Sequence, residues 1–339
     1  MDDLVQLKSL VYKTFQSSPT VTALLVALGT FSVVRLVYQT LVVLAQIFVL
    51  PGKSLKKFGA KQGAWAVVTG ATDGIGKEFA LQLAKAGFNI LLVARNKELL
   101  SQTAQEIENK YHVSSEFHSI DFAKADEAAY HGFAAACDGK NIGVLVNNVG
   151  KSHNMPVNFA ETPLDEVNDI LTINCNATLR VTYTVLPSMV QRKRGLILNV
   201  GSFAGAVPSP MLATYSASKA FLTTFSSALA EEVKKDNIVV EHVNTYFVVS
   251  KLSKIRKPTP LIPYPAPFVR SVLSKIGLPV GAAFSGRPST STPFWSHALL
   301  DYVMTLLGGR DVFMGYTHRL HKDIRRRALK KAEREAKKA

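Results

Sequence analysis

The chain is poor in cysteine, because its 339 residues include only Cys137 and Cys175. Two cysteines cannot form the disulfide framework of a small secreted protein, so we expect the folded part to occupy a reducing compartment. The eight histidines show no ligand spacing near cysteines or paired carboxylates, and we predict no metal site. The length suits one domain of about 250 residues with appendages better than two domains.

Acidic residues are also scarce, with 25 Asp and Glu against 40 Lys and Arg, giving a formal charge of +15. Residues 318–339 hold ten of these basic residues and three acidic ones, so the excess is concentrated in a basic tail. No nucleic-acid motif accompanies it, so we predict no nucleic-acid partner and favour a membrane surface. We expect this tail to be helical or disordered at the bilayer. A protein that binds nucleic acid would instead still bind it after deletion of the tail.

Charge is almost absent between Val21 and Leu50, where Arg35 is the only charged residue. A bilayer span needs roughly 20 apolar residues, so we predict a polar segment 1–20 and a transmembrane anchor 21–50. Arg35 would cost about 2.5–3.5 kcal/mol at mid-bilayer, and we expect it near one end of the span. An in-plane or re-entrant segment is the alternative. The following lysines place the rest of the chain in the cytosol by the positive-inside rule: Lys53, Lys56, Lys57 and Lys61.

From Ala64 onward, short apolar runs alternate with segments of helical period, which is typical of an α/β protein with a doubly wound parallel sheet of Rossmann type. We expect strands near residues 64–69, 88–94, 114–120, 142–147, 195–201 and 237–246, with a weak last strand near 287–293. We expect helices near residues 74–86, 96–110, 124–137, 164–190 and 211–235.

A glycine-rich turn follows the first expected strand, in Thr69-Gly70-Ala71-Thr72-Asp73-Gly74-Ile75-Gly76. Glycines at these positions let the backbone turn tightly and approach a pyrophosphate that rests on a helix N-terminus. Residues 51–292 are therefore predicted to form a dinucleotide-binding domain. Arg95 lies at the end of the second strand, where arginine accommodates the 2′-phosphate of NADPH and an acidic residue would favour NAD. An ordinary helix-flanking arginine is the alternative.

Tyr215 and Lys219 are four residues apart before an apolar run, which places them on one face of an expected helix. A free tyrosine titrates near pH 10, and a nearby ammonium lowers that pKa, so Tyr215 could pass a proton to a forming alkoxide. Ser202 follows the strand near 195–201, at the edge where parallel sheets hold their site residues. A surface Tyr and Lys would explain the spacing alone. The serine and the glycine turn make a catalytic site the better interpretation.

These motifs, from about Ala64 to about Ser253, resemble the short-chain dehydrogenase/reductase family, which carries Thr-Gly-x-x-x-Gly-x-Gly, Asn-Asn-x-Gly, a serine and Tyr-x-x-x-Lys in this order. The resemblance implies that Tyr215 is the proton donor, Ser202 holds the substrate carbonyl, and Asn174 extends a proton relay through a water to Lys219. Thr245 and Ser250 replace the Pro and Thr that the family has after the sixth strand. The implied cofactor contacts are Val68, Gly70, Asp73, Gly74, Ile75, Gly76, Arg95, Asp121, Asn148, Tyr215, Lys219, Val248 and Ser250.

Within this family, the glycine turn and the stretches Leu145–Gly150 and Ser253–Thr259 are similar to one branch. That branch contains endoplasmic-reticulum reductases of very-long-chain 3-oxoacyl-CoA, with relatives among the membrane 17β-hydroxysteroid dehydrogenases. The resemblance implies NADPH-dependent reduction in the fatty acid elongation cycle, which feeds sphingolipid and membrane lipid synthesis. It also implies a single-pass reticulum protein whose partners are other elongation-cycle enzymes. A membrane steroid reductase and a catalytically idle scaffold are the rival functions, and Tyr215→Phe would leave the scaffold's phenotype unchanged.

The segment 250–267 occupies the position of the family's substrate loop. The basic residues of this segment are Lys251, Lys254, Arg256 and Lys257. They could form a solvated face, bind the phosphates of CoA or contact lipid headgroups. Pro258–Pro267 is proline-rich and predicts an irregular lid, whereas Phe268–Ile276 has helical spacing. The apolar region 293–317 suits a membrane-surface helix or a wall of an acyl tunnel.

Overall fold

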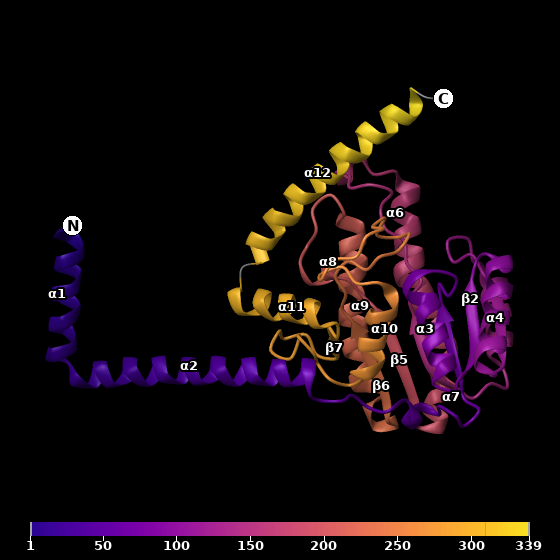
Figure 1. Cartoon of the computed structure of the whole chain (residues 1–339), viewed down its shortest axis with the longest axis horizontal. Helices are drawn as coiled ribbons and strands as arrows, with labels where there is room; N and C mark the ends of the chain where they lie inside the picture. Colours follow the sequence, from indigo (N-terminus) through magenta and orange to yellow (C-terminus); the bar gives the residue numbers. More distant parts are fainter. Residues whose placement is uncertain (1, 309, 338–339) are drawn as a thin grey trace. The chain divides into compact units, whose positions relative to one another are not determined.

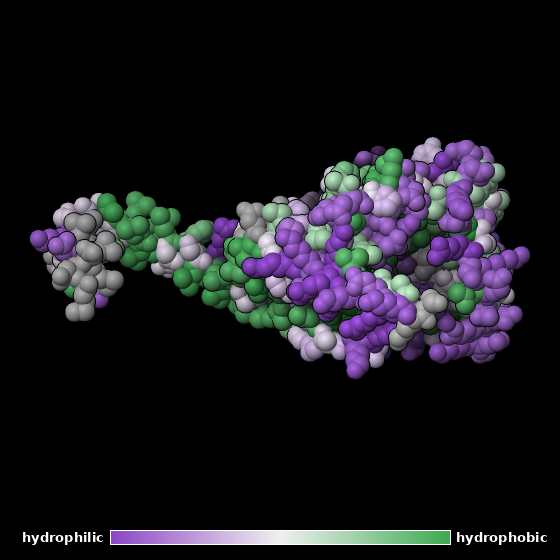
Figure 2. All heavy atoms as spheres, turned by 90° about the horizontal axis from the view of Figure 1, so that it is seen from above, coloured by the Kyte–Doolittle hydropathy of each residue, from purple (hydrophilic) through white to green (hydrophobic). Residues whose placement is uncertain are grey.

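The computed structural model describes residues 2–308 and 310–337 and divides the chain into two compact units, Met1–Ala45 and Gln46–Ala339 (Figure 1). The smaller unit contains α1 (Asp2–Ser17) and most of α2 (Pro19–Phe48). Among the described residues, α2 is the one helix long and apolar enough to cross a membrane, and its most apolar window has no buried residue. Figure 2 shows the apolar side chains that gather along it. Arg35 falls near the middle of α2, so its depth depends on which part of the helix spans.

The larger unit is built on a seven-stranded sheet in the order β3-β2-β1-β4-β5-β6-β7, and every neighbouring pair is parallel. This confirms the doubly wound α/β fold expected from the sequence. The strands are β1 (Trp65–Thr69), β2 (Asn89–Ala94), β3 (Ser115–Ser119), β4 (Ile142–Asn147), β5 (Gly195–Val200), β6 (Ile238–Val243) and β7 (Thr290–Ser291). The weak last strand is present, although only two residues of it pair with β6.

Helices cover both faces of the sheet, because successive residues of each strand point to opposite faces. Val68 packs in a core with Phe79, Leu83 and Phe268, whereas its neighbour Val67 packs in a second core behind the sheet. The first core is formed by α3 (Gly74–Lys85), α4 (Lys97–Tyr111) and α10 (Pro265–Ser274). The second is formed by α5 (Glu127–Cys137), α7 (Ala177–Arg192) and α9 (Ala213–Glu232).

Two helix predictions need correction. The single helix expected over 164–190 is α6 (Leu164–Leu171), a π-helical turn (Thr172–Asn176) and α7. The lid expected to be irregular through Pro267 becomes helical at Pro265, because proline is tolerated in the first turn of a helix, where its missing N–H has no partner. The hydrophobic spacing of the sequence reports neither difference.

Two further helices follow β7, namely α11 (Trp295–Leu307) and α12 (Arg310–Ala336). The basic tail is therefore helical through Ala336, while Lys338 and Ala339 at its end lie outside the described residues. The imidazole of His321 bonds the carbonyl oxygen of Pro210 at 2.7 Å, and Arg325 pairs with Glu161 at 2.6 Å. These contacts dock α12 against the rest of the larger unit.

Glu241 is a buried carboxyl group on β6 that accepts a 2.7 Å hydrogen bond from the Gly277 amide. Burial raises its pKa from 4.5 to about 7, and the bonds from Gly277 and Ser291 and the charge of Lys53 only partly oppose this. Because the pKa of Glu241 is higher in the folded than in the unfolded protein, its protonated carboxyl stabilises the fold at low pH. This stabilisation is complete below about pH 4.5 and is lost as the pH rises through 7.

We expect Glu241→Gln to remove this loss, because glutamine keeps an acceptor for Gly277 and cannot ionise. Between pH 4.5 and 8, the free energy of unfolding of the wild type should fall by roughly 3 kcal/mol more than that of the variant, at 1.36 kcal/mol per pKa unit. Denaturant titrations of both proteins across this pH range measure the difference. Parallel pH profiles for the two proteins would contradict it.

Candidate active site

The turn between β1 and α3 has no room for side chains. Gly70 and Gly74 have φ of +66° and +56°, and a Cβ on Gly76 would lie 2.2 Å from the Gly70 carbonyl oxygen and 2.4 Å from Asn148 Nδ2. Asp73 occupies the N-cap position of α3 but its side chain makes no capping hydrogen bond. The first amides of α3 therefore have no side-chain cap, which fits the pyrophosphate of a dinucleotide.

Thr69, the last residue of β1, ties this turn to the end of β4. Its hydroxyl donates to the Val146 carbonyl at 3.3 Å and accepts from the amides of Asn148 and Val149 at 3.0 and 3.1 Å. The Asn148 amide group in turn donates to the carbonyls of Thr69 and Gly70 at 3.0 and 3.3 Å. Asn148 thus holds the turn, while its expected contact with the cofactor stays a prediction. Thr69 was not among the predicted site residues, although it opens the glycine motif.

Thr69→Val is expected to lower the free energy of unfolding by about 1–3 kcal/mol and to weaken cofactor binding. Valine matches the shape of threonine but leaves the Asn148 and Val149 amides without their acceptor. Thr69→Ser keeps the hydroxyl and is the matched control. Denaturant titration and cofactor titration of both variants test this expectation, and equal behaviour of Val and Ser would contradict it.

Ser202, Tyr215 and Lys219 meet at the carboxyl end of β5. Ser202 caps the short helix α8 (Phe203–Ala206) by accepting a 3.2 Å bond from the Ala204 amide, and it also hydrogen-bonds the Tyr215 hydroxyl. Tyr215 and Lys219 lie one turn apart on α9, with the ammonium 5.8 Å from the centre of the Tyr215 ring. Lys219 is buried and donates to the Val200 carbonyl at 2.8 Å. The structure thus places three of the four predicted catalytic side chains in one cluster.

The electrostatics of this cluster differ from the expectation. Burial raises the pKa of Tyr215, and the hydrogen bond with Ser202 only opposes that rise. Burial also lowers the pKa of Lys219 to about 8. The predicted lowering of the Tyr215 pKa by Lys219 is therefore wrong for this structure, because the ammonium is bonded to Val200 and its own charge is disfavoured by burial. The tyrosine is held in its protonated form.

Asn174 lies in the π-helical turn between α6 and α7 and is fully buried. Its side chain donates to the Lys151 carbonyl and to Ser218 Oγ, both at 2.9 Å, and accepts from the Lys151 amide at 2.8 Å. A Cβ on Gly150 would lie 3.4 Å from Asn174 Oδ1 and 3.7 Å from Lys219 Nζ. Asn174 is therefore close to Lys219 without bonding it, and a relay through water stays a prediction.

Arg95 and Asp121 follow β2 and β3 at the same edge of the sheet as the glycine turn. Both side chains are exposed, and no carboxylate of the described residues pairs with the Arg95 guanidinium. The Arg95 carbonyl accepts a 3.1 Å bond from the Ser119 hydroxyl, and Asp121 accepts one of 3.2 Å from the Ala123 amide. A free arginine at this position fits a phosphate group.

Two of the predicted cofactor contacts lie in the core. The side chain of Val68 is fully buried in the first core and supports the turn from behind, and the expected contact of this residue with the cofactor stays a prediction. Val248 is also buried there, and its carbonyl accepts a 2.7 Å bond from the Ser253 hydroxyl. Ile75 is half-buried and packs against the same core. Sequence reasoning placed them near the cofactor but could not assign the direction of each side chain.

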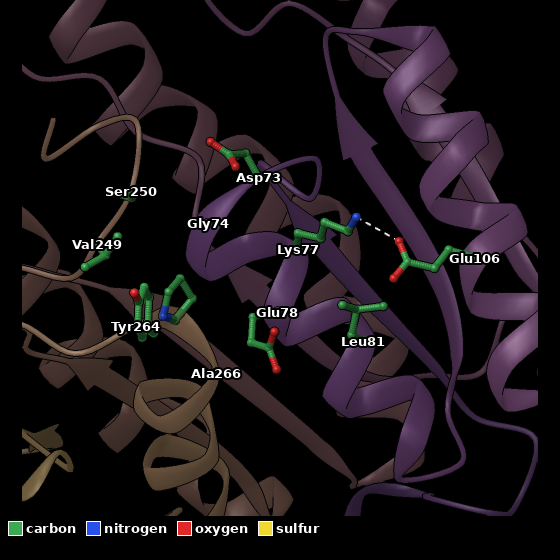
Figure 3. A pocket seen from close by; sticks show the side chains of 11 residues that line it. Asp73, Gly74, Lys77, Glu78, Leu81, Glu106, Val249, Ser250, Tyr264 and Ala266 are labelled. Atoms are coloured by element: carbon green, nitrogen blue, oxygen red, sulfur yellow. Dashed lines mark ion pairs between the residues drawn. The ribbon is translucent and has the colours of Figure 1, made fainter. Parts of the chain in front are cut away.

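The substrate loop crosses the N-terminus of α3 (Figure 3). Ser250 Cβ would lie 3.3 Å from a Cβ on Gly74, Lys251 pairs with Asp73 at 3.8 Å, and Lys254 Nζ donates to the Asn154 carbonyl at 2.6 Å. Arg256 and Lys257 are exposed. A pocket of about 440 Å³ opens beside this crossing and not at Tyr215; it is lined by Asp73, Gly74, Lys77, Glu78, Leu81, Glu106, Val249, Ser250, Tyr264, Pro265 and Ala266.

The first turn of α11 holds the lid through two side chains that sequence reasoning missed. Ser296 donates to the Pro260 carbonyl at 2.7 Å, and His297 Nε2 bonds the Leu261 carbonyl at 2.9 Å. The other ring nitrogen of His297 accepts from the Tyr246 amide at 3.3 Å. Burial lowers the pKa of His297 to about 4, so the ring is neutral at pH 7 and links α11, the lid and the segment after β6.

Known proteins share both the sequence and the fold of this chain. The short chain dehydrogenase family matches residues 64–260. The very-long-chain 3-oxoacyl-CoA reductase of Coprinopsis cinerea is 67% identical over 99% of both chains. A second match is a structure from a study of the stereoselectivity of 7β-hydroxysteroid dehydrogenase. The alignment covers 78% of this chain and 99% of that one, with a TM-score of 0.67 and 22% sequence identity. L-sorbose reductase from Gluconobacter frateurii, solved with NADPH and L-sorbose, has a TM-score of 0.52 at 28% identity and covers 59% of this chain and 72% of its own. The chain belongs to the short-chain dehydrogenase family.

Proposed function

We propose that the protein reduces very-long-chain 3-oxoacyl-CoA to 3-hydroxyacyl-CoA with NADPH, as a step of fatty acid elongation. The observation that carries this proposal is the 67% identity, over almost the entire length, to a reductase named for that substrate. The cluster of Ser202, Tyr215 and Lys219 supports it, because a ketone reduction needs a proton donor and a hydrogen-bond donor at the carbonyl oxygen.

In this mechanism the bound nicotinamide supplies a hydride to C3 of the substrate. Ser202 orients the 3-oxo oxygen by a hydrogen bond, and Tyr215 donates its phenolic proton to that oxygen as negative charge develops. Tyr215 is protonated before turnover, because burial keeps the pKa of its phenol above the ordinary value. Lys219, one helical turn away, would bond the ribose of the nicotinamide nucleotide.

NADPH is the proposed cofactor because the residues at this edge of the sheet suit its phosphates. The turn at Gly70, Gly74 and Gly76 gives the pyrophosphate close access to the first amides of α3, and the unpaired Arg95 would hold the 2′-phosphate. Asp121 would lie beside the adenine. The NADPH complex of the 28% identical L-sorbose reductase supports the same choice.

We further propose that α2 crosses the endoplasmic reticulum membrane once and leaves the larger unit in the cytosol. The length and apolar composition of α2 support the span, and the lysines that follow it support this orientation. Membrane lipids and other enzymes of the elongation cycle would then be its neighbours. The cytosol also supplies both NADPH and acyl-CoA.

The proposed activity is tested by NADPH oxidation with detergent-solubilised protein and two substrates, a long-chain 3-oxoacyl-CoA and a 17-ketosteroid. We expect turnover of the thioester, with little or none of the steroid. Turnover of the steroid alone would assign the protein to the steroid branch. Absence of turnover with either substrate, while NADPH still binds, would contradict the proposed function and leave the fold assignment unchanged.

A further inference from the structure

One face of α12 carries a stripe of positive charge. Residues 322, 325, 326, 329, 330 and 333 recur at intervals of three and four, so they share one side of the helix. Together with Met211 they line a groove of about 370 Å³, whose lining residues are Met211, Lys322, Arg325, Arg326, Leu329, Lys330 and Glu333. The groove is therefore lined by four cations and one carboxylate.

Two of these cations have partners and two have none. Arg325 pairs with Glu161 at 2.6 Å, but its Nη1 is buried and without a hydrogen-bond acceptor. Arg326 pairs with Asp323 at 2.8 Å on its own helix. Within residues 310–337 and the rest of the described chain, Lys322 and Lys330 have no carboxylate partner. The groove thus retains unbalanced positive charge after its neighbouring acids are counted.

The wall opposite α12 lies just before the catalytic helix α9 in the sequence. Met211 is buried, has φ of +67°, and accepts a 2.9 Å bond from the Val157 amide. It precedes Tyr215 by four residues, and Pro210, beside it, is the residue that His321 of α12 bonds. The position of the groove relative to α9 is therefore fixed by hydrogen bonds at its inner end. Figure 1 shows α12 at the end of the unit where α8 lies.

We infer that this groove binds the phosphate groups of the nucleotide half of CoA, with the thioester extending past Met211 toward Tyr215. The inference rests on the proposed function, because acyl-CoA joins a reactive acyl group to phosphates through a long arm. Lysine and arginine side chains are the groups that bind phosphate most strongly. In the substrate loop, Lys251 pairs with Asp73 and Lys254 bonds the Asn154 carbonyl, so these two lysines suit the task less well.

A pair of charge-matched double variants tests the inference. Lys322→Gln/Lys330→Gln removes two groove cations, and Lys331→Gln/Arg334→Gln removes two cations of α12 that do not line the groove. Steady-state rates are measured in nonionic detergent with a 3-oxoacyl-CoA and with the N-acetylcysteamine thioester of the same acyl chain, which has no phosphate. We expect the groove variant to raise KM for the CoA thioester by about tenfold or more. The kcat of the groove variant and its KM for the N-acetylcysteamine thioester should stay unchanged. In the control variant, kcat and KM should stay unchanged for both thioesters.

An unchanged KM for the CoA thioester, or an equal rise in both double variants, would overturn the inference. An effect that appears only in vesicles containing anionic lipid, and not in nonionic detergent, would assign the groove to lipid headgroups and also overturn it. Calorimetric titration with CoA alone separates this inference from the proposed function. Binding to the wild type that is lost in the groove variant supports the site even for a protein inactive on both thioesters, and absence of binding to the wild type refutes it.

Discussion

Tyr215→Phe is expected to lower kcat for ketone reduction by about 10²–10⁴-fold, the usual contribution of a positioned general acid. Phenylalanine keeps the packing of the ring beside Lys219 and removes only the hydroxyl that hydrogen-bonds Ser202. The proton for the forming alkoxide would then have to come from water. Steady-state kinetics with saturating NADPH and 3-oxoacyl-CoA measure the loss.

A matched control is Tyr183→Phe, because Tyr183 lies on α7 with 82% of its surface exposed. This variant should keep wild-type kinetics. NADPH titration should show that Tyr215→Phe still binds the cofactor, which excludes misfolding as the cause of the loss. A Tyr215→Phe protein that retains more than about a tenth of the wild-type kcat would contradict the role of Tyr215 as proton donor.

Gly76→Ala is expected to weaken cofactor binding strongly. The added Cβ would lie 2.2 Å from the Gly70 carbonyl oxygen and 2.4 Å from Asn148 Nδ2, and the first of these is backbone that cannot move aside without opening the turn. Overpacking of this kind costs about 1–3 kcal/mol. Because this cost destabilises the conformation of the turn that binds the pyrophosphate, NADPH affinity should drop by about ten- to a hundredfold. Fluorescence titration with NADPH and thermal unfolding measure both effects.

Gly315→Ala is the control for this substitution, because Gly315 lies within α12 and no atom lies within 4 Å of an added Cβ. It should leave NADPH binding unchanged and stabilise the helix by up to about 1 kcal/mol. Wild-type NADPH affinity in Gly76→Ala would show that the turn does not hold the pyrophosphate.

The sheet and its helices were predictable because the spacing of apolar residues within each segment indicates its secondary structure. Strands such as Ile142–Asn147 are continuous apolar runs, and glycines mark the turn that follows the first strand. The π-helical turn at Thr172–Asn176 was not predictable, since it depends on bonds from Asn174 to Lys151 and Ser218, which lie far away in sequence. The hydrophobic pattern continues through it without a break.

The residue types of the candidate site were predictable, whereas their directions and charge states were not. The motif identified Tyr215 and Lys219, but only the fold shows that burial raises one pKa and lowers the other. Val68 was expected at the cofactor, and the pleat of β1 turns it into the core. The docking of α12 through His321 and Pro210 joins residues 111 apart, so a charge count could only report a basic tail.

The transfer of hydride to the 3-oxo carbon is tested most directly with NADPH that carries deuterium at both positions on C4 of its nicotinamide. Purified protein is incubated with this cofactor and a very-long-chain 3-oxoacyl-CoA, and the product is analysed by mass spectrometry. We predict 3-hydroxyacyl-CoA with one deuterium, located at C3, and almost none of this product from Tyr215→Phe. Product without deuterium at C3, or no 3-hydroxyacyl-CoA from a protein that binds both ligands, would contradict the assignment of this chain as a 3-oxoacyl-CoA reductase.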